Sequence, residues 1–136
     1  MSKPIPTINK YMTPMPHSIN TEQTVGQASG IMQDYRIRHL PVLKGNRLIG
    51  IVTDRDIKLI ESVGDVDPER MTVDYAMSVS PFTVAPEAPL DEVVREMANK
   101  KYGCAVIVQD GAVIGIFTMV DACQALADLL HTRLAK

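Results

Sequence analysis

An internal repeat constrains the fold of this chain more than any other feature of its sequence. The stretch Ile49–Asp56 returns as Ile114–Asp121, with glycine, threonine and aspartate at matching places. The offset is 65 residues, the difference between positions 49 and 114, and it also aligns Met12 with Met77. We therefore expect one structural unit to occur twice in the chain, as two small subdomains that share one core.

Each copy ends in an apolar strand that runs into Thr-x-x-Asp and then into a helix. A threonine at this place accepts a hydrogen bond from a free backbone N–H of the first turn, and an acidic residue three positions later favours the same turn. Thr53 with Asp56, and Thr118 with Asp121, are therefore predicted helix caps. Capping alone would explain one such pair, but two pairs in the same strand context weaken that explanation.

The remaining segments predict the same order of elements in both halves: helix, strand, helix, strand, strand, helix. A capping box at Thr24 and Gln27 opens the second helix of the first half. The apolar residues of that helix and of its counterpart recur at helical spacing, so we expect them to form core faces. The first face carries Val25, Ala28 and Met32, and the second, in a helix that starts near Pro89, carries Leu90, Val93, Val94 and Met97.

Turns and glycines mark the predicted boundaries. Lys44–Asn46 and Gln109–Gly111 read as tight turns between the two strands of each half. Gly64 is the expected C-cap of the helix that follows Asp56. We accordingly divide the chain into a first unit, residues 1–64, and a second unit, residues 65–136.

The last predicted helix, Met119 to about Ala135, is apolar on two sides. One side carries Val120, Cys123, Leu126, Ala127, Leu130 and Leu134, and the other carries Ala122, Ala125 and Leu129. A helix with one solvated side needs only one apolar face, so the additional set indicates a further packing surface. The sequence leaves two alternatives open, namely another subunit or both halves of the same chain.

Composition and charge exclude several classes of function. A net charge of −2 and the lack of tryptophan argue against a general nucleic-acid-binding surface. Cys104, Cys123 and three scattered histidines show neither metal-site spacing nor a disulfide framework. The sequence has no apolar run long enough to span a bilayer and no signal core, so we expect a cytoplasmic protein. It also lacks a nucleophile–base pair and a P-loop, so we do not expect an enzyme.

The repeated Gly-x-x-Thr-x-x-Asp ending, the strand Arg38–Val42 and the opening Met12-Thr13-Pro14 together resemble a tandem pair of CBS (cystathionine β-synthase) domains. The resemblance covers the chain from Met12 to Asp121. It implies an α/β fold in which two pseudosymmetric β-α-β-β-α units pack sheet to sheet as one module with two clefts. It further implies regulatory binding of AMP, ADP or ATP, with S-adenosylmethionine as a further candidate, and pairing into a homodimer.

The resemblance also implies where an adenosine ligand would lie. Its ribose hydroxyls would donate to Asp56 or Asp121, assisted by Thr53 or Thr118, and a carboxylate has enough acceptor sites for two adjacent hydroxyls. Its adenine would lie between the short first strand and the following strand of each copy. The residues concerned are Ile19, Leu40, Pro41 and Val42 in the first copy, and Val84, Cys104, Ala105 and Val106 in the second.

The two copies differ at the predicted phosphate end of this ligand. The first copy offers four basic residues, Arg36, Arg38, His39 and Arg55, as partners for phosphate. The second copy has Lys100 and Lys101, but Gly103, Cys104 and Val120 replace Arg38, His39 and Arg55. We therefore expect the first copy to bind a phosphorylated ligand better, while a solvated surface charge remains the alternative for each arginine.

Two functions follow from these observations. The first is a regulatory, energy-sensing module that binds an adenine nucleotide between its two copies and signals to a separate effector protein of unknown identity. It would use no catalytic cofactor and no metal, and would contact neither nucleic acid nor membrane. The alternative is a structural dimerisation module that binds no ligand, in which the Thr-x-x-Asp pairs serve only as helix caps.

Overall fold

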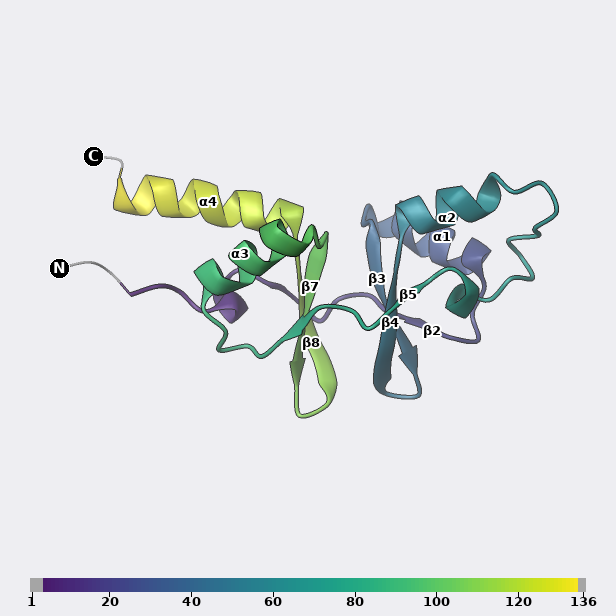
Figure 1. Cartoon of the computed structure of the whole chain (residues 1–136), viewed down its shortest axis with the longest axis horizontal. Coiled ribbons are helices and arrows are strands. Elements are labelled where there is room, and N and C mark those ends of the chain that lie inside the picture. Colours follow the sequence, from purple (N-terminus) through teal and green to yellow (C-terminus); the bar gives the residue numbers. More distant parts are fainter. Residues whose placement is uncertain (1–3, 135–136) are drawn as a thin grey trace. The chain divides into compact units, whose positions relative to one another are not determined.

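The computed structural model describes residues 4–134, which form two compact units (Figure 1). Residues 16–81 make the first-copy unit, named for the first Thr-x-x-Asp motif that it contains. Residues 4–15 and 82–134 make the second-copy unit. Each unit carries one four-stranded mixed sheet with helices beside it, which confirms the predicted α/β class.

The first-copy unit places its strands in the order β2-β3-β4-β5. Strands β2 and β3 are parallel, whereas the pairs β3–β4 and β4–β5 are antiparallel. Its elements are β2 (Ile19–Asn20), α1 (Val25–Tyr35), β3 (His39–Lys44), β4 (Arg47–Thr53), α2 (Asp54–Glu61), the 3-10 helix η2 (Val73–Tyr75) and β5 (Ser78–Val79). The tight turn between β3 and β4 contains Gly45 at a φ of 63°, a backbone conformation that favours glycine.

The second-copy unit repeats this plan with the strand order β1-β8-β7-β6. Strands β6 and β7 are parallel, and the other two pairs are antiparallel. Its elements are the 3-10 helix η1 (Ile8–Lys10), β1 (Thr13–Pro14), β6 (Thr83–Val84), α3 (Leu90–Lys100), β7 (Cys104–Gln109), β8 (Ala112–Thr118) and α4 (Met119–Arg133). The predicted order of elements is present in both halves of the chain, with one additional two-residue strand in each half, β1 or β5, that the sequence did not predict.

Each unit takes an edge strand from the lead-in of the other half of the sequence. Thr13 pairs with Ile116 in the second-copy unit, and Ser78 pairs with Ile51 in the first-copy unit. These pairings attach residues 4–15 to the second copy and residues 65–81 to the first. The compact units therefore differ from the sequence-based division at residue 64, because a repeat offset shows which segments correspond but not which strands they join.

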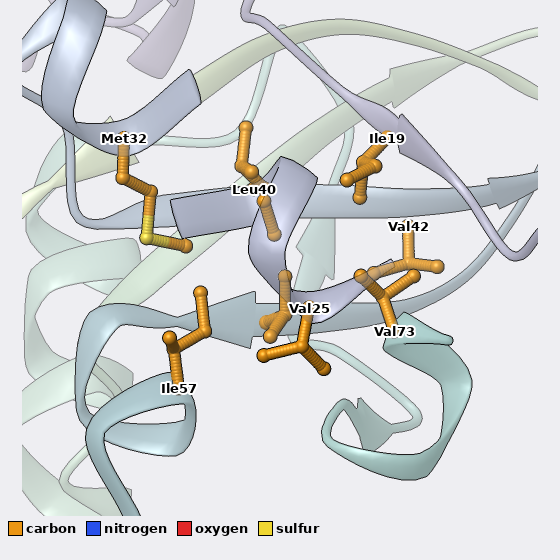
Figure 2. Packing of buried hydrophobic residues seen from close by; sticks show 9 residues of the cluster. Ile19, Val25, Met32, Leu40, Val42, Ile57 and Val73 are labelled. Atoms are coloured by element: carbon orange, nitrogen blue, oxygen red, sulfur yellow. The ribbon is translucent and has the colours of Figure 1, made fainter. Parts of the chain in front are cut away.

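A hydrophobic core fills the space between helices and sheet in each unit. Figure 2 shows the core of the first-copy unit, where Leu40 and Val42 of β3 meet Val25 and Met32 of α1. The second-copy unit has an equivalent cluster that contains Leu90, Val93, Met97, Ala105, Ile107 and Phe117. The predicted core faces of α1 and α3 are confirmed.

The predicted N-termini of three helices are confirmed, whereas one predicted C-terminus is wrong. The capping boxes at Thr24 and Thr53 are present, and Thr118 is the N-cap of α4. The predicted C-cap at Gly64 is wrong, since α2 ends at Glu61 and Ser62 occupies the C-cap. The N–H of Ser62 bonds to carbonyls of the last turn, so α2 ends without a glycine.

Helix α4 covers its own unit with one side only. Asp121 and Ala125 are its buried residues, whereas Val120, Leu126 and Leu130 are 67%, 59% and 48% exposed. The apolar side predicted to need a further partner is therefore exposed along the described part of the helix. Within residues 4–134, no helix combines the length and apolarity needed to cross a membrane.

Candidate functional site

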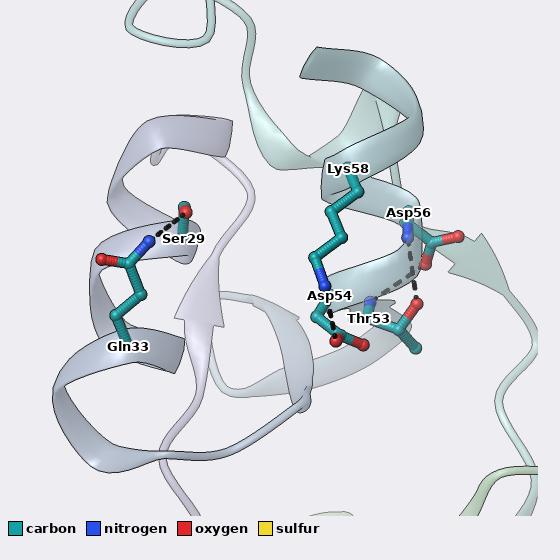
Figure 3. Close-up of polar contacts among 6 residues, drawn as sticks. All are labelled: Ser29, Gln33, Thr53, Asp54, Asp56 and Lys58. Atoms are coloured by element: carbon teal, nitrogen blue, oxygen red, sulfur yellow. Dashed lines mark hydrogen bonds and ion pairs between the residues drawn. The ribbon is translucent and has the colours of Figure 1, made fainter. Parts of the chain in front are cut away.

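The Thr-x-x-Asp motif of the first copy forms a capping box at the start of α2 (Figure 3). The backbone N–H of Thr53 donates to Oδ2 of Asp56 at 3.0 Å, and the N–H of Asp56 donates to Oγ1 of Thr53 at 3.2 Å. Asp56 is half-buried, and its Oδ1 accepts no hydrogen bond from any residue within 4–134. A half-exposed carboxylate with acceptor sites to spare can receive hydroxyl donors from a ligand.

The aspartate of the second-copy motif accepts more hydrogen bonds from the protein than Asp56 does. Asp121 is only 8% exposed, and its Oδ2 accepts the backbone N–H of Thr118 at 2.8 Å and the Thr118 hydroxyl at 3.3 Å. Its Oδ1 accepts the hydroxyl of Thr13 at 3.0 Å. The two aspartates therefore occupy matching positions in the repeat but differ in their free acceptor capacity.

A groove between α1 and α2 of the first-copy unit has a volume of about 470 Å³ and carries three basic side chains. Arg36 and Arg38 follow α1, and Lys58 lies in α2, where its Nζ is 3.7 Å from Oδ2 of Asp54. We call this feature the cationic groove. Its polar lining is Ser29, Gln33, Arg36, Arg38, Asp54, Lys58 and Glu61, and its apolar lining is Met32, Ile37 and Ile57.

The groove contains part of the predicted phosphate site. Arg36 and Arg38 line it, whereas His39, Arg55 and Asp56 do not. Asp54 lines the groove from the first turn of α2, but Asp56 lies on another side of that helix, because residues two positions apart do not share a face. Lys58 was not predicted. Its signal in the sequence was the i,i+4 spacing from Asp54, which places both side chains on one face of a helix.

His39 lies beside the capping box, since it is the register partner of Thr53 across β3 and β4. Burial lowers the pKa of His39 below its ordinary value of 6.5; Asp54 acts in the opposite direction. The imidazole is therefore uncharged at neutral pH and offers hydrogen bonds rather than a positive charge. Arg36, Arg38 and Lys58 supply the cationic character of this region.

The side chains predicted to contact adenine lie mostly in the cores. Ile19, Leu40 and Val42 belong to the core cluster of the first-copy unit, and Ala105 belongs to that of the second-copy unit. Pro41 and Val106 are also buried, but they belong to neither cluster, because neighbouring strand residues point to opposite faces of a sheet. The core residues can therefore offer a ligand only their backbone.

Two further candidates of the second copy lie at the ends of its strands. Val84 ends β6 and is half-buried beside the core, and Cys104 begins β7 as the register partner of Thr118. Burial raises the pKa of the Cys104 thiol to about 12. The thiol is therefore protonated at neutral pH, which agrees with a packing role rather than a nucleophilic one.

Comparison with known proteins identifies the family. The sequence model of the CBS domain matches this chain twice, over residues 1–60 and 69–128. The chain belongs to the CBS-domain family. Each matched CBS segment contains one Thr-x-x-Asp motif, so both capping pairs are part of a family unit.

Individual CBS-domain proteins agree with this assignment. An inosine-5'-monophosphate dehydrogenase from Korarchaeum cryptofilum is 33% identical over 76% of this chain, which spans only 21% of the dehydrogenase. The crystal structure of a Vibrio cholerae protein named for acetoin utilization, AcuB, superposes with a TM-score of 0.87 at 27% identity and covers 98% of both chains. A crystal structure of CBSX2 in complex with AMP superposes with a TM-score of 0.80 at 24% identity, over 90% of this chain and 97% of CBSX2.

Proposed function

We propose that this CBS-domain protein is a regulatory module whose first-copy unit binds an adenosine nucleotide. The observation that carries the proposal is the half-buried Asp56, whose Oδ2 holds the helix cap while Oδ1 remains available to ribose. Helix α2, which begins at this motif, also lines the cationic groove, whose Arg36, Arg38 and Lys58 suit the phosphates of AMP, ADP or ATP. The AMP complex of CBSX2, a protein of the same fold, supports this ligand class.

Binding would act on a second protein rather than on a substrate. A ligand shifts a conformational equilibrium only as far as it binds one arrangement better than the other. We propose that the nucleotide does so here, and that a cytoplasmic effector protein responds to the difference. The exposed Val120, Leu126 and Leu130 of α4 support pairing with a second copy of the chain, because apolar side chains in a row favour burial.

The second candidate function, a dimerisation module without a ligand, rests on the same helix caps. Asp121 favours it for the second-copy unit, because both oxygens of this carboxylate already accept hydrogen bonds from threonines of the protein. The other residues of that unit predicted to contact adenine would then serve only packing; they are Val84, Cys104, Ala105 and Val106.

A thermal-shift panel with AMP, ADP, ATP and S-adenosylmethionine separates the two functions. A ligand at 100 times its dissociation constant stabilises a protein by about 2.7 kcal/mol. We therefore expect at least one phosphorylated member of the panel to raise the melting temperature by several degrees. An unchanged melting temperature with all four ligands would leave dimerisation as the function.

Arg36 provides a test of the phosphate end. It is the C-cap of α1 and holds left-handed backbone angles of φ 55° and ψ 45°, where glycine is the favoured residue. Arg36→Gly should raise the free energy of unfolding by roughly 0.5 kcal/mol because it relieves this strain. It should also weaken AMP binding by about tenfold or more, since a charge-assisted hydrogen bond is lost.

Lys101 is the matched control for Arg36. It is the C-cap of α3 with φ 61° and ψ 38°, and it lies in the second-copy unit. Lys101→Gly should give the same gain in stability without a change in AMP affinity, measured by denaturant unfolding and by calorimetry. Equal AMP affinities for the two variants would show that Arg36 is only a solvated surface charge.

A further inference from the structure

The Thr13 hydroxyl occupies the acceptor oxygen of Asp121 that corresponds to the available oxygen of Asp56. It donates to Oδ1 of Asp121 at 3.0 Å, although 108 positions separate the two residues in the sequence. Thr13 lies in β1, where it pairs with Ile116 of β8, and β8 leads directly into the motif. The backbone of the edge strand therefore places this hydroxyl against the motif.

The segment that carries Thr13 is held along the length of α4. The hydroxyl of Tyr11 donates to Asp128, and Nη2 of Arg133 donates to the carbonyl of Pro4 at 2.8 Å. After the strand, the N–H of Met15 donates to the carbonyl of Ile114 at 3.0 Å. Thr13 is thus fixed from both sides, and an intramolecular hydroxyl fixed in this way competes at high effective concentration with any hydroxyl from solution.

The first copy lacks the equivalent contact. Ser78 corresponds to Thr13 at the repeat offset and has the equivalent register partner, Ile51. Its hydroxyl makes no hydrogen bond to Asp56 within the described residues 4–134. Asp56 is half-buried, whereas Asp121 is 8% exposed and already accepts three hydrogen bonds.

We infer that Thr13 is a specificity-determining residue that closes the second-copy unit to ribose. Its hydroxyl takes the place that one hydroxyl of a ribose diol would take on Asp121, so the chain holds one nucleotide and holds it at Asp56. This inference rests on the proposed function, since it assigns that function to one of the two motifs. It is independent of the basic residues at the phosphate end, because it concerns the diol alone.

The test is the number of adenosine or AMP molecules bound per chain, measured by isothermal titration calorimetry. Thr13→Val keeps the branched shape on the exposed strand β1 but removes the hydroxyl. We expect one site in the wild type and two in Thr13→Val, with the additional site abolished in Thr13→Val/Asp121→Ala. Adenosine is the sharper probe, because it carries no phosphate and so does not depend on the basic residues that differ between the copies. Melting temperatures of all variants confirm that each is folded.

Two conservative variants serve as controls. Thr13→Ser restores a hydroxyl at the same place and should restore the single site of the wild type. Ser78→Ala removes the corresponding hydroxyl of the first-copy unit and should leave both the stoichiometry and the affinity unchanged.

Failure of this inference is distinguishable from failure of the proposed function. Two sites in the wild type, or a single site in Thr13→Val, would overturn the role of Thr13 while the nucleotide-binding function stands. No binding by either protein would overturn both. Binding by Thr13→Val alone, lost with Asp121→Ala, would support the role of Thr13 and move the nucleotide site away from Asp56.

Discussion

Replacement of Asp56 by alanine is expected to weaken adenosine nucleotide binding by about 100-fold or more. Hydrogen bonds to a charged group contribute about 1.5–3 kcal/mol each, and a ribose diol would make two of them to this carboxylate. The variant also loses the acceptor of the Thr53 N–H, a helix-cap contact whose loss costs about 1 kcal/mol of stability. Calorimetric titration with AMP measures the first effect, and denaturant unfolding measures the second.

Asp121→Ala is the matched control, because it removes the corresponding carboxylate of the other copy. Its loss of stability should be larger than that of Asp56→Ala, since Asp121 is buried and accepts from Thr13 as well as Thr118. Its AMP affinity should remain within a few-fold of the wild type. An AMP affinity that survives Asp56→Ala but falls in Asp121→Ala would reverse our assignment of the two motifs.

Local sequence patterns were sufficient to predict most of the secondary structure. The capping boxes at Thr24 and Thr53 each depend on residues three positions apart, and the core face of α3 depends on a single helical period. Such features lie within one element, so the sequence shows them directly. The predicted end of α2 at Gly64 failed because the N–H of Ser62, two residues earlier, already bonds to carbonyls of the last turn.

The exchange of lead-in strands could not be predicted in the same way. Strands β1 and β5 contain two residues each, which is too short for a recognisable alternation. Their assignment depends on long-range pairing, such as Thr13 with Ile116. The hydrogen bond from Thr13 to Asp121 follows from this pairing and was missed for the same reason.

The candidate site was predicted in part. The sequence singled out Arg36 and Arg38, which line the cationic groove, but it missed Lys58, because its i,i+4 spacing from Asp54 is a pattern that ordinary solvated helix faces share. It also proposed Leu40 and Val42 as ligand contacts, whereas both side chains lie in the core. Strand alternation could have revealed this, since both lie on one face of β3 together.

Alanine should destabilise the protein more at Gly50, in the first copy, than at the corresponding Gly115 in the second copy. A Cβ atom at Gly50 would lie 2.8 Å from the backbone oxygen of Ser78 and 2.6 Å from Sδ of Met77. The Ser78 carbonyl belongs to the neighbouring strand β5, so it can move only if the pairing of β4 with β5 is disturbed. Gly50→Ala should therefore lower the free energy of unfolding by about 3 kcal/mol, measured by denaturant unfolding.

Gly115→Ala provides the comparison, because the atoms nearest to a Cβ at Gly115 all belong to the side chain of Met12. Methionine is flexible enough to rotate away, so this variant should lose only about 1 kcal/mol. The double variant Gly115→Ala/Met12→Ala should then lose less stability than the sum of the losses of its two single variants. Gly50→Ala/Met77→Ala should lose the full sum. If both double variants lose less than the sum, the methionine side chains, and not the Ser78 carbonyl, are what exclude a Cβ atom at these glycines. Because β4 runs directly into Thr53, a displaced β4–β5 pair should also reduce AMP affinity in Gly50→Ala, whereas Gly115→Ala should leave it unchanged.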